Sequence, residues 1–392
     1  MKKSSRFLGL LFVLATLIGS QVLAEVNPVL LTNLAPTSGF GALAVSDGYL
    51  YSAGDAFRIF DISNRANPVQ VGTVNVGSSG LALSGNHALV LNGSLHSYYG
   101  AILSIFDVSD PANPISIGEI PGSWFSVAAS GRFVYLGGGS GPTGYWVSIY
   151  DISDPANPAS VGRINTGGFV TSIVVRNNFA YMVGYSTWLL VSDVSDPFNP
   201  ITPQQNAAGA GFDVALSGNF ACIATGFTNT LEIYDISNQT NHFIVSNPLA
   251  YGQSVTVSGN YAYVVGGNFL SIVNISNPTN ASIVLSDNAL PPGFAQPHMA
   301  AVSGNYAYVG TVAGLRVYYL AMPAPPLGIS SSTSNILLSW PTPTGAFEVQ
   351  QSPDLHLANW ITLTNRPVVV GSKNQVAIPK PDGTMFYRLA LQ

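Results

Sequence analysis

The chain has 392 residues, of which 47% are hydrophobic and 8% are charged, so it is long enough for one large domain and a small one. Its net charge is −5, and three of its 13 Lys and Arg residues lie within the first six positions, which leaves no basic stripe for nucleic acid or an anionic membrane surface. The single cysteine, Cys222, excludes an intramolecular disulfide, and the apolar run around it predicts a buried thiol.

The first 24 residues are organised like a secretory signal peptide. The basic segment "MKKSSR" precedes a 12-residue apolar stretch, and the small-residue sequence "VLA" ends at Ala24. A transmembrane helix needs about 20 apolar residues, so we expect no transmembrane span here or later in the chain. We therefore expect residues 1–24 to be removed and the mature protein to be secreted or extracytoplasmic, in the periplasm or at the cell surface.

Two turn sequences recur along the rest of the chain. The first begins with Asp and has an Asn six residues later; it starts at Asp61, Asp107, Asp151, Asp193 and Asp235, and as a variant at Asn274. The second is "SGN" or a close relative; it begins at Ser46, Ser84, Ser130, Arg176, Ser217, Ser258 and Ser303. Polar turns between alternating apolar runs indicate β-hairpins.

Each repeat unit therefore contains four short strands. In the first copy we predict them at Leu43–Ser46, Tyr49–Ala53, Phe57–Ile62 and Val69–Val76. Successive Asp markers lie 39 to 46 residues apart, which is the length of one β-propeller blade. The sequence predicts an all-β fold, a seven-bladed β-propeller over residues 25–321.

The last unit has no fourth strand, because "AMPAPPLG" follows its third. The segment "NPVLLTNLAP" at Asn27–Pro36 matches "NPVQVGTVNV" at Asn67–Val76, yet no other strand of its own unit precedes it. We therefore expect the N-terminal strand to complete the seventh blade and close the ring, which removes two exposed sheet edges.

The recurring "DIS…NP" and "SGN" sequences, with strands such as "FRIFD", "LSIFD" and "LEIYD", resemble the LVIVD-repeat family of secreted bacterial proteins over about residues 27–320. The family is defined by its fold and its repeat and has no established common chemistry. The resemblance therefore implies a β-propeller and export, and no particular activity.

The C-terminal part is expected to form a second unit. Residues 322–335 are rich in Pro and Ser and predict a linker, and residues 336–392 contain five strand-like runs that predict a small β-sandwich-like domain. Its "LSWP" and "FYRL" sequences resemble fibronectin-III-like modules that end many secreted bacterial proteins, where such a module serves sorting, adhesion or spacing. We expect Trp340 and Trp360 to be core residues of this sandwich.

The recurring Asp residues allow two interpretations. Calcium requires six to eight oxygen ligands that converge on one point, and "DISDPANP" lacks the spacing of a calcium loop while its copies lie in different blades. Asp and Ser side chains also bond nearby backbone N–H groups in tight turns, and Pro presets the following corner. We favour the turn and expect no metal and no cofactor.

A ligand is expected at the opposite end of the blades, where the connections vary and carry aromatic residues. The predicted binding residues are Trp124, Tyr145, Trp146, Tyr185, Trp188, Gln253 and His298. The position four residues before each "SGN" turn should line the mouth of the central channel; these residues are Ala42, Gly80, Ser126, Ser172, Asp213, Ser254 and Met299.

Three functions remain open from the sequence. The first is an exported binding or interaction module that takes an extracellular glycan or a cell-envelope protein through the aromatic loops. The second is an enzyme, a hydrolase or lyase, with Asp213 and His298 as the acid and base candidates, although no G-x-S-x-G nucleophile elbow supports it. The third is a structural extracellular protein. We expect a monomer.

Overall fold

The computed structural model describes residues 27–34, 40–93, 101–138, 144–184, 189–201, 211–226, 228, 230–237, 242–248, 252–266, 269–287, 299–311, 314–321, 327–332, 334–341, 347–354, 360–371, 373–381 and 383–391. Within these ranges the chain is all-β apart from a short 3-10 turn, η1 (Pro278–Asn280). No helix in the described part is long and apolar enough to cross a membrane. The predicted signal peptide lies outside the described residues.

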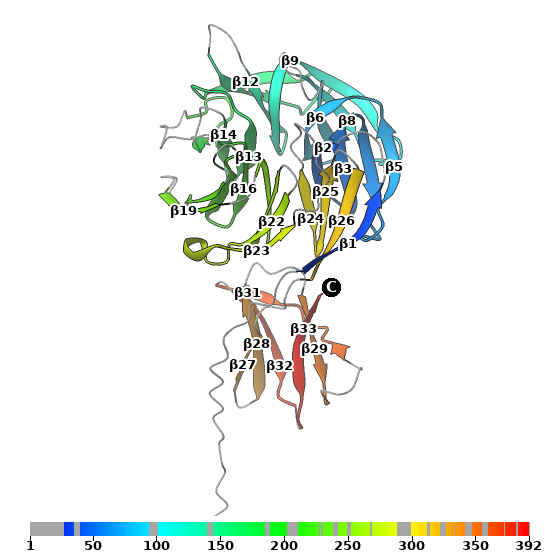
Figure 1. The fold of residues 1–392 in the computed structure, drawn as a ribbon, viewed down its shortest axis with the longest axis vertical. Coiled ribbons are helices and arrows are strands. Elements are labelled where there is room, and N and C mark those ends of the chain that lie inside the picture. Colours follow the sequence, from blue (N-terminus) through cyan, green and yellow to red (C-terminus); the bar gives the residue numbers. More distant parts are fainter. Residues whose placement is uncertain are drawn as a thin grey trace, which may run out of the picture.

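Antiparallel sheets of sequential strands make up residues 40–321, and Figure 1 shows them around a common centre. The first sheet contains β2 (Phe40–Ser46), β3 (Tyr49–Gly54), β4 (Phe57–Asp61) and β5 (Val69–Val74). These strands agree with the four predicted for the first repeat within three residues at each end. The agreement arises because tight turns separate alternating apolar runs, which set the strand boundaries.

The second and third repeats share one strand. Their strands are β6 (Ser78–Ser84), β7 (His87–Asn92), β8 (Ala101–Asp107), β9 (Ile115–Ser130), β10 (Phe133–Gly138), β11 (Trp146–Asp151) and β12 (Ala159–Asn165). The first part of β9 pairs with β8 and its last part pairs with β10, so the seven strands form one sheet. The segment "PGSWFS" around Trp124, a residue predicted to lie in one of the variable connections, is extended chain in the middle of β9.

The next three repeats form separate sheets. The fourth repeat contains β13 (Ser172–Arg176), β14 (Phe179–Val183) and β15 (Leu190–Asp193). The fifth contains β16 (Asp213–Ser217), β17 (Phe220–Ala224), β18 (Thr230–Asp235) and β19 (His242–Pro248). The sixth contains β20 (Ser254–Ser258), β21 (Tyr261–Gly266), β22 (Phe269–Asn274) and β23 (Ser282–Asp287).

The two ends of this region meet in one sheet. Strands β24 (Ala300–Ser303), β25 (Tyr306–Thr311) and β26 (Gly314–Ala321) are joined at their outer edge by β1 (Asn27–Leu34). The register pairs Asn27 with Ala321 and Leu34 with Leu315. The predicted pairing of the N-terminal strand with the last repeat is therefore confirmed.

Seven apolar clusters fill the spaces between consecutive repeats. One of them lies between the last sheet and the first, where Leu50 and Phe60 pack against Tyr308 and Leu315. The first strands of the repeats also contact one another in order: β2 with β6, β6 with β9, β9 with β13, β13 with β16, β16 with β20, β20 with β24, and β24 with β2. Cys222 belongs to one of these clusters and is fully buried as predicted; burial raises the pKa of its thiol to about 12.

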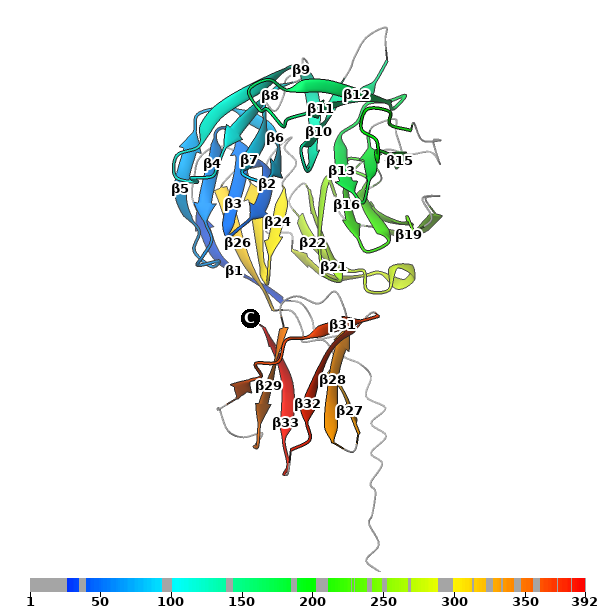
Figure 2. The ribbon, with the colours of Figure 1, turned by 180° about the vertical axis from the view of Figure 1, so that it is seen from behind.

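The C-terminal module contains two sheets, which Figure 2 shows beside the larger region. One holds β27 (Gly328–Ser331), β28 (Asn335–Pro341), β31 (Val368–Val370) and β32 (Lys373–Pro379), and the other holds β29 (Phe347–Ser352), β30 (Ile361–Thr362) and β33 (Phe386–Leu391). All five predicted strands are present. Strands β27 and β31 are additional, and β27 lies inside the segment expected to be a linker.

The two tryptophans of the module differ in their surroundings. Trp340 is 2% exposed and belongs to the core cluster, as predicted. The prediction that Trp360 is also a core residue is wrong, because Trp360 is half-buried and its ring lies beneath the Arg388 guanidinium. The strand that follows Trp360 has only two residues, and their alternation turns the indole to the outer side of the sheet.

Candidate functional site

The sheets have two ends of different character. We call the end with the recurring Asp sequences the Asp-turn face; it carries the turns that follow Asp61, Asp107, Asp151, Asp193 and Asp235. We call the opposite end the connection face; it carries the turns between second and third strands and the links from one sheet to the next.

On the Asp-turn face the carboxylates bond to their own turns. In all five turns the Asp Oδ1 accepts a hydrogen bond from the backbone N–H two residues later, at 2.7–2.8 Å. Where a second Asp is present, as at Asp154, its oxygens accept from the backbone N–H of Ala156 and the side-chain amide of Asn157. The structure confirms that the motif forms turns stabilised by local hydrogen bonds.

These local hydrogen bonds also favour the ionised form of the Asp carboxyl groups. The backbone N–H of Ser109 and the Ser109 side chain hold the pKa of Asp107 below its ordinary value, and the pKa values of Asp61 and Asp193 are lowered in the same way. In the described part of the chain, no three or more His, Cys, Asp or Glu side chains are grouped as a metal site.

On the connection face, one carboxyl group joins three consecutive sheets. Asp213 is the first residue of β16, and its Oδ1 accepts from the Ser172 hydroxyl at 2.7 Å, while its Oδ2 accepts from the Ser254 hydroxyl at 2.9 Å. The backbone N–H groups of Val214 and Val255 each donate to one of the same oxygens at 2.9 Å. The sequence predicted that Ser172, Asp213 and Ser254 all line the channel mouth, and the structure brings the three together.

The surroundings of Asp213 oppose its ionisation. Burial of the carboxyl group raises the pKa of Asp213, and the hydrogen bonds from Ser172, Val255, Ser254 and Val214 offset only part of that rise. A buried carboxyl group with a raised pKa is typical of functional sites, and it also occurs in purely structural networks. Both oxygens of Asp213 are occupied by donors from the protein.

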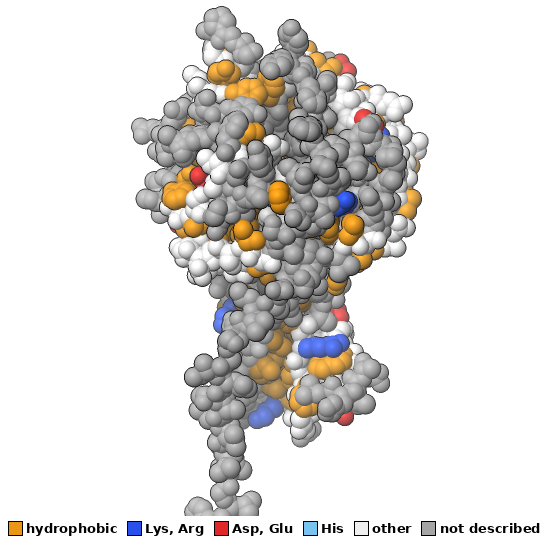
Figure 3. Space-filling model, in the orientation of Figure 1, with side chains coloured by type: hydrophobic (Ala, Val, Ile, Leu, Met, Phe, Trp, Pro, Cys, Tyr) orange, Lys and Arg blue, Asp and Glu red, His pale blue; other side chains and the backbone are white. Residues whose placement is uncertain are grey.

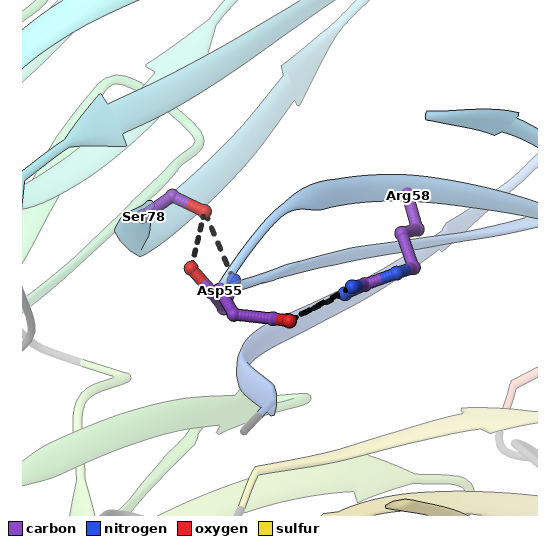
Figure 4. Close-up of polar contacts among 4 residues, drawn as sticks. Asp55, Arg58 and Ser78 are labelled. Atoms are coloured by element: carbon purple, nitrogen blue, oxygen red, sulfur yellow. Dashed lines mark hydrogen bonds and ion pairs between the residues drawn. The ribbon is translucent and has the colours of Figure 1, made fainter. Parts of the chain in front are cut away.

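A second polar contact lies on the same face, at the turn between β3 and β4. The Arg58 guanidinium donates two hydrogen bonds to the Asp55 carboxylate, at 2.7 and 3.0 Å, and the Arg58 side chain is 6% exposed (Figure 4). The neighbouring Gly54 N–H donates to the Ser78 hydroxyl at 2.9 Å and so joins this turn to the next repeat. Asp55 is, after Asp213, the second carboxylate described on this face, and the Arg58 guanidinium neutralises its negative charge.

Three aromatic side chains gather where the third repeat meets the fourth. Phe125 and Phe169 pack edge to face with centroids 4.6 Å apart, and Tyr145 packs edge to face on Phe169 at 6.3 Å. We call Phe125, Tyr145 and Phe169 the aromatic cluster. Tyr145 is 37% exposed and the two Phe residues are half-buried, so the cluster presents part of its rings to solvent.

Hydrogen bonds from the backbone and from short side chains position this cluster. The Thr166 N–H donates to the Tyr145 carbonyl at 3.2 Å, and the Thr166 hydroxyl donates to the Gly168 carbonyl at 2.8 Å. The Ser126 hydroxyl donates to the Val170 carbonyl at 3.1 Å. The backbone on both sides of Phe169 is thus hydrogen-bonded within the protein. The position of the Phe169 ring is therefore set without a ligand.

The other predicted binding residues have separate outcomes. Trp124 is 7% exposed and its Nε1–H donates to the Ile120 carbonyl at 3.2 Å, so its ring belongs to the interior and we leave it out of the surface. Trp146 is half-buried, with the Arg163 guanidinium 3.6 Å from its ring centroid. Gln253 is half-buried beside Ser254, and its backbone N–H donates to Val265. Tyr185, Trp188 and His298 lie outside the described residues.

Two contributors were missed from the sequence. Phe169 is an aromatic residue in a link from one repeat to the next, the same context that drew attention to Trp124, so the same signal could have found it. The Arg58 pairing has a weaker signal, because a basic residue three positions after an Asp is common on exposed hairpins. Only the packing of neighbouring sheets shows that this arginine is buried.

Comparison with known proteins places the repeats in a family. The LVIVD repeat matches residues 41–76, 78–120, 121–166, 167–203, 208–248, 251–288 and 299–317, which is more than half of the chain. No curated protein matches the chain in sequence.

Solved structures share its fold at low identity. The RRP9 WD40 repeats are 8% identical with a TM-score of 0.56, and the match covers 76% of this chain and 98% of that one. The computationally designed Ika8 protein is 12% identical with a TM-score of 0.51, over 74% of this chain and 98% of that one. These likenesses show a β-propeller-like fold and carry no activity.

Proposed function

The chain belongs to the LVIVD-repeat family, and from this premise we propose that it is an exported β-propeller whose connection face binds a neutral carbohydrate. The observation that carries the proposal is the aromatic cluster: three partly exposed rings on a face with few charges, fixed by hydrogen bonds to a rigid scaffold.

The scaffold we infer is a closed ring of seven blades. The pairing of β1 with β26 supports it, because this strand joins the beginning of the repeat region to its end. The apolar cluster between the last sheet and the first supports it as well, as does the contact between β24 and β2. Closure would keep the positions of the aromatic rings constant, because no sheet is left free to move at an open edge.

The place of action follows from the N-terminal segment. The basic, apolar and small-residue regions of residues 1–24 support secretion of a mature chain that begins near Glu25. Five matching strands support a fibronectin-III-like assignment for residues 336–392. We infer a monomer outside the cytoplasm, with an extracellular or envelope glycan as its ligand.

The chemistry of the cluster favours a sugar. The C–H groups on one side of a pyranose ring are weakly positive and pack against the negative face of an aromatic ring. Neutral glycans carry hydroxyl groups and no charge. Two carboxyl groups described on this face are already satisfied, Asp55 by Arg58 and Asp213 by four donors. A surface of this kind suits a neutral ligand.

One observation favours an enzyme as the second candidate. The raised pKa of Asp213 would suit a general acid at the mouth of the channel. An enzyme would release a product from the bound glycan, and Asp213→Asn would abolish that release while leaving binding intact. Absence of any product from glycans that the protein retains would remove this candidate.

The test is a glycan-binding screen with purified residues 25–392. We expect retention on at least one neutral glycan, and a loss of affinity of about tenfold or more for both Tyr145→Ala and Phe169→Ala, since tenfold corresponds to ~1.4 kcal/mol of lost contact. Phe198→Ala is the matched control, because Phe198 is an aromatic residue that is 53% exposed on the Asp-turn face. Unchanged affinity in both cluster variants, or an equal loss in the control, would refute the proposal.

A further inference from the structure

The outer face of the three-stranded sheet β30-β29-β33 in the C-terminal module carries a group of hydrogen-bonded polar side chains. This group is separate from the connection face of the propeller. On β29, Val349 is buried in the module's core, so its neighbours Glu348 and Gln350 lie on the opposite side of the strand. The register places Gln350 opposite Arg388 on β33 and opposite Thr362 on β30. These side chains therefore form a row across three strands.

Hydrogen bonds run along this row in one direction. The Arg388 Nε–H donates to the Gln350 Oε1 at 2.9 Å, and this bond orients the Gln350 amide so that its NH₂ group points the other way. That group lies 3.1 Å from Glu348 Oε1 and 3.3 Å from Thr362 Oγ1. The Thr362 hydroxyl donates to the same Glu348 oxygen at 2.6 Å.

The Arg388 side chain is held on two sides. Its guanidinium carbon lies 4.3 Å from the centroid of the Trp360 ring, so one face of the group stacks on the indole. Its Nε–H is taken by Gln350, and the side chain as a whole is exposed. Within the described residues, no carboxylate lies within ion-pair distance of this group. Among the described residues its two Nη groups have no hydrogen-bond partner, so they are available to a ligand.

A fixed and unpaired guanidinium fork suits an oxyanion. Two parallel N–H donors match the two oxygens of a carboxylate, or two oxygens of a sulfate, and a side chain already held in place loses little freedom on binding. Figure 3 shows a basic side chain lying across an apolar one at the surface over β29 and β33.

The distribution of charge points to the same class of ligand. Residues 25–321 carry six Arg and no Lys against fifteen Asp and Glu, whereas residues 322–392 carry two Lys and two Arg against three Asp and Glu. The C-terminal module therefore has a net charge of +1, four basic against three acidic residues, and residues 25–321 have a net charge of −9, six against fifteen. The net charges therefore disfavour an anionic ligand on the propeller more than on the module.

We propose that the row formed by Arg388, Trp360, Gln350 and Thr362 is a second binding site, which holds an oxyanion group of an acidic polysaccharide. Arg388 binds the carboxylate or sulfate through its Nη groups. The edge of Trp360 and the Thr362 hydroxyl, which is exposed, lie next to it and contact the sugar ring that bears the anion. The polar row favours a polysaccharide over an acidic peptide, because it offers a ring and a hydroxyl beside the fork. This site is independent of the neutral-sugar surface on the propeller.

The proposed site predicts that a substitution at Glu348 strengthens binding of the ligand. Its carboxylate lies on the same face and shares Gln350 with Arg388, so its negative charge opposes an incoming anion. Glu348→Gln keeps a hydrogen-bond acceptor and removes the charge. We expect this substitution to strengthen binding of an acidic polysaccharide about twofold to fivefold at low salt.

The test is affinity electrophoresis of residues 25–392 in gels that contain polygalacturonate, dextran sulfate, uncharged dextran or polyglutamate. We expect retardation by polygalacturonate, dextran sulfate or both, which distinguishes the carboxylate from the sulfate source, and weaker or no retardation by dextran and polyglutamate. Arg388→Lys retains the charge and loses the fork, and it should weaken retardation at least about tenfold. Lys380→Met is the matched control, since Lys380 is exposed elsewhere on the module and its loss should change little.

Several results would overturn the proposal. They are no retardation of the unsubstituted protein by either acidic polysaccharide, equal retardation by polyglutamate, equal binding of Arg388→Lys, or an equal loss in Lys380→Met. If Arg388→Lys alters the thermal melting curve, the NMR resonance of the Arg388 Nε in the unsubstituted protein provides the second measurement. Addition of the acidic polysaccharide should shift that resonance, and an unshifted resonance at saturating polysaccharide would also contradict the site.

Discussion

The recurring Asp turns and Asp213 lie at opposite ends of the same sheets, and they differ in how their carboxyl groups are satisfied. On the Asp-turn face each carboxylate bonds within its own turn, two or three residues away. On the connection face the Asp213 carboxyl group reaches across sheets, to Ser172 and Ser254, which lie 41 residues away on either side. Local bonds can be copied from repeat to repeat, whereas bonds between sheets depend on which repeats are neighbours.

This difference explains which positions vary from one repeat of the chain to the next. The Asp-turn face repeats one solution, so its sequence reports the architecture. The connection face has Ala, Gly, Ser, Asp or Met at equivalent positions, and it carries the partly exposed aromatic cluster. We therefore propose that the first face is structural and that the second binds the ligand.

The largest loss of stability is expected when the strand that closes the ring is removed, because both faces depend on the ring. Deletion of residues 27–34 removes the outer strand of the last sheet, and we expect the midpoint of thermal unfolding to fall by roughly 10 °C or more, the shift that a loss of several kcal/mol causes in a large domain. Circular dichroism melting would measure it. Leu30→Ala is the control: it leaves the backbone pairing intact, and Leu30 is 46% exposed, so the midpoint should barely move. A normal midpoint after the deletion would contradict closure of the ring.

A smaller loss is expected from Asp213→Ala. This substitution leaves two backbone N–H groups and two hydroxyls without their acceptor, which costs about 2 kcal/mol of the free energy of unfolding. Chemical denaturation measures this value. Asp154→Ala removes two bonds on the Asp-turn face, whose donors can turn to water, so its effect should be clearly smaller. Equal effects would remove the distinction between the faces.

The contribution of Asp213 to the free energy of unfolding should increase as pH falls. Its pKa is raised by burial, so the folded protein binds this proton more tightly than the unfolded chain, whose Asp pKa is about 3.9. The stabilising contribution of this proton is therefore present at low pH and is lost as pH rises through the folded pKa. The free energy of unfolding of the unsubstituted protein, relative to that of Asp213→Asn, should increase as pH falls. A relative decrease would show that the hydrogen bonds outweigh burial.

The opposite sign, and the smallest effect, are expected at Asp107. The pKa of this carboxylate is lowered by the backbone N–H of Ser109, so its contribution is present above the unfolded pKa and is lost as pH falls through the folded value. The unsubstituted protein should therefore lose its advantage over Asp107→Asn in acid. The same denaturation series checks this, and a difference between the two proteins that stays constant from pH 7 to pH 3 would argue against a stabilising turn.

The sequence predicts the repeating parts of this molecule better than the parts that differ between repeats. The strands of the first repeat and the pairing of the N-terminal strand follow from turn chemistry and alternation, which are local. The contact of Ser172 with Asp213 and Ser254 follows from counting residues within a repeat. Trp124 could not be placed that way, because its burial depends on a continuous β9 and on glycines that make room for the ring. Trp360 depends on a strand of only two residues, which leaves no periodic pattern to read.

The central claim is that ligands bind the connection face, and footprinting by oxidative labelling and mass spectrometry tests it most directly. Residues 25–392 would be labelled with and without a saturating mixture of neutral extracellular glycans. The account predicts protection of Tyr145 and Phe169, and unchanged labelling of Phe198 and Phe243, which are 53% and 55% exposed. Protection of Phe198 and Phe243 with no change at Tyr145 and Phe169 would contradict it.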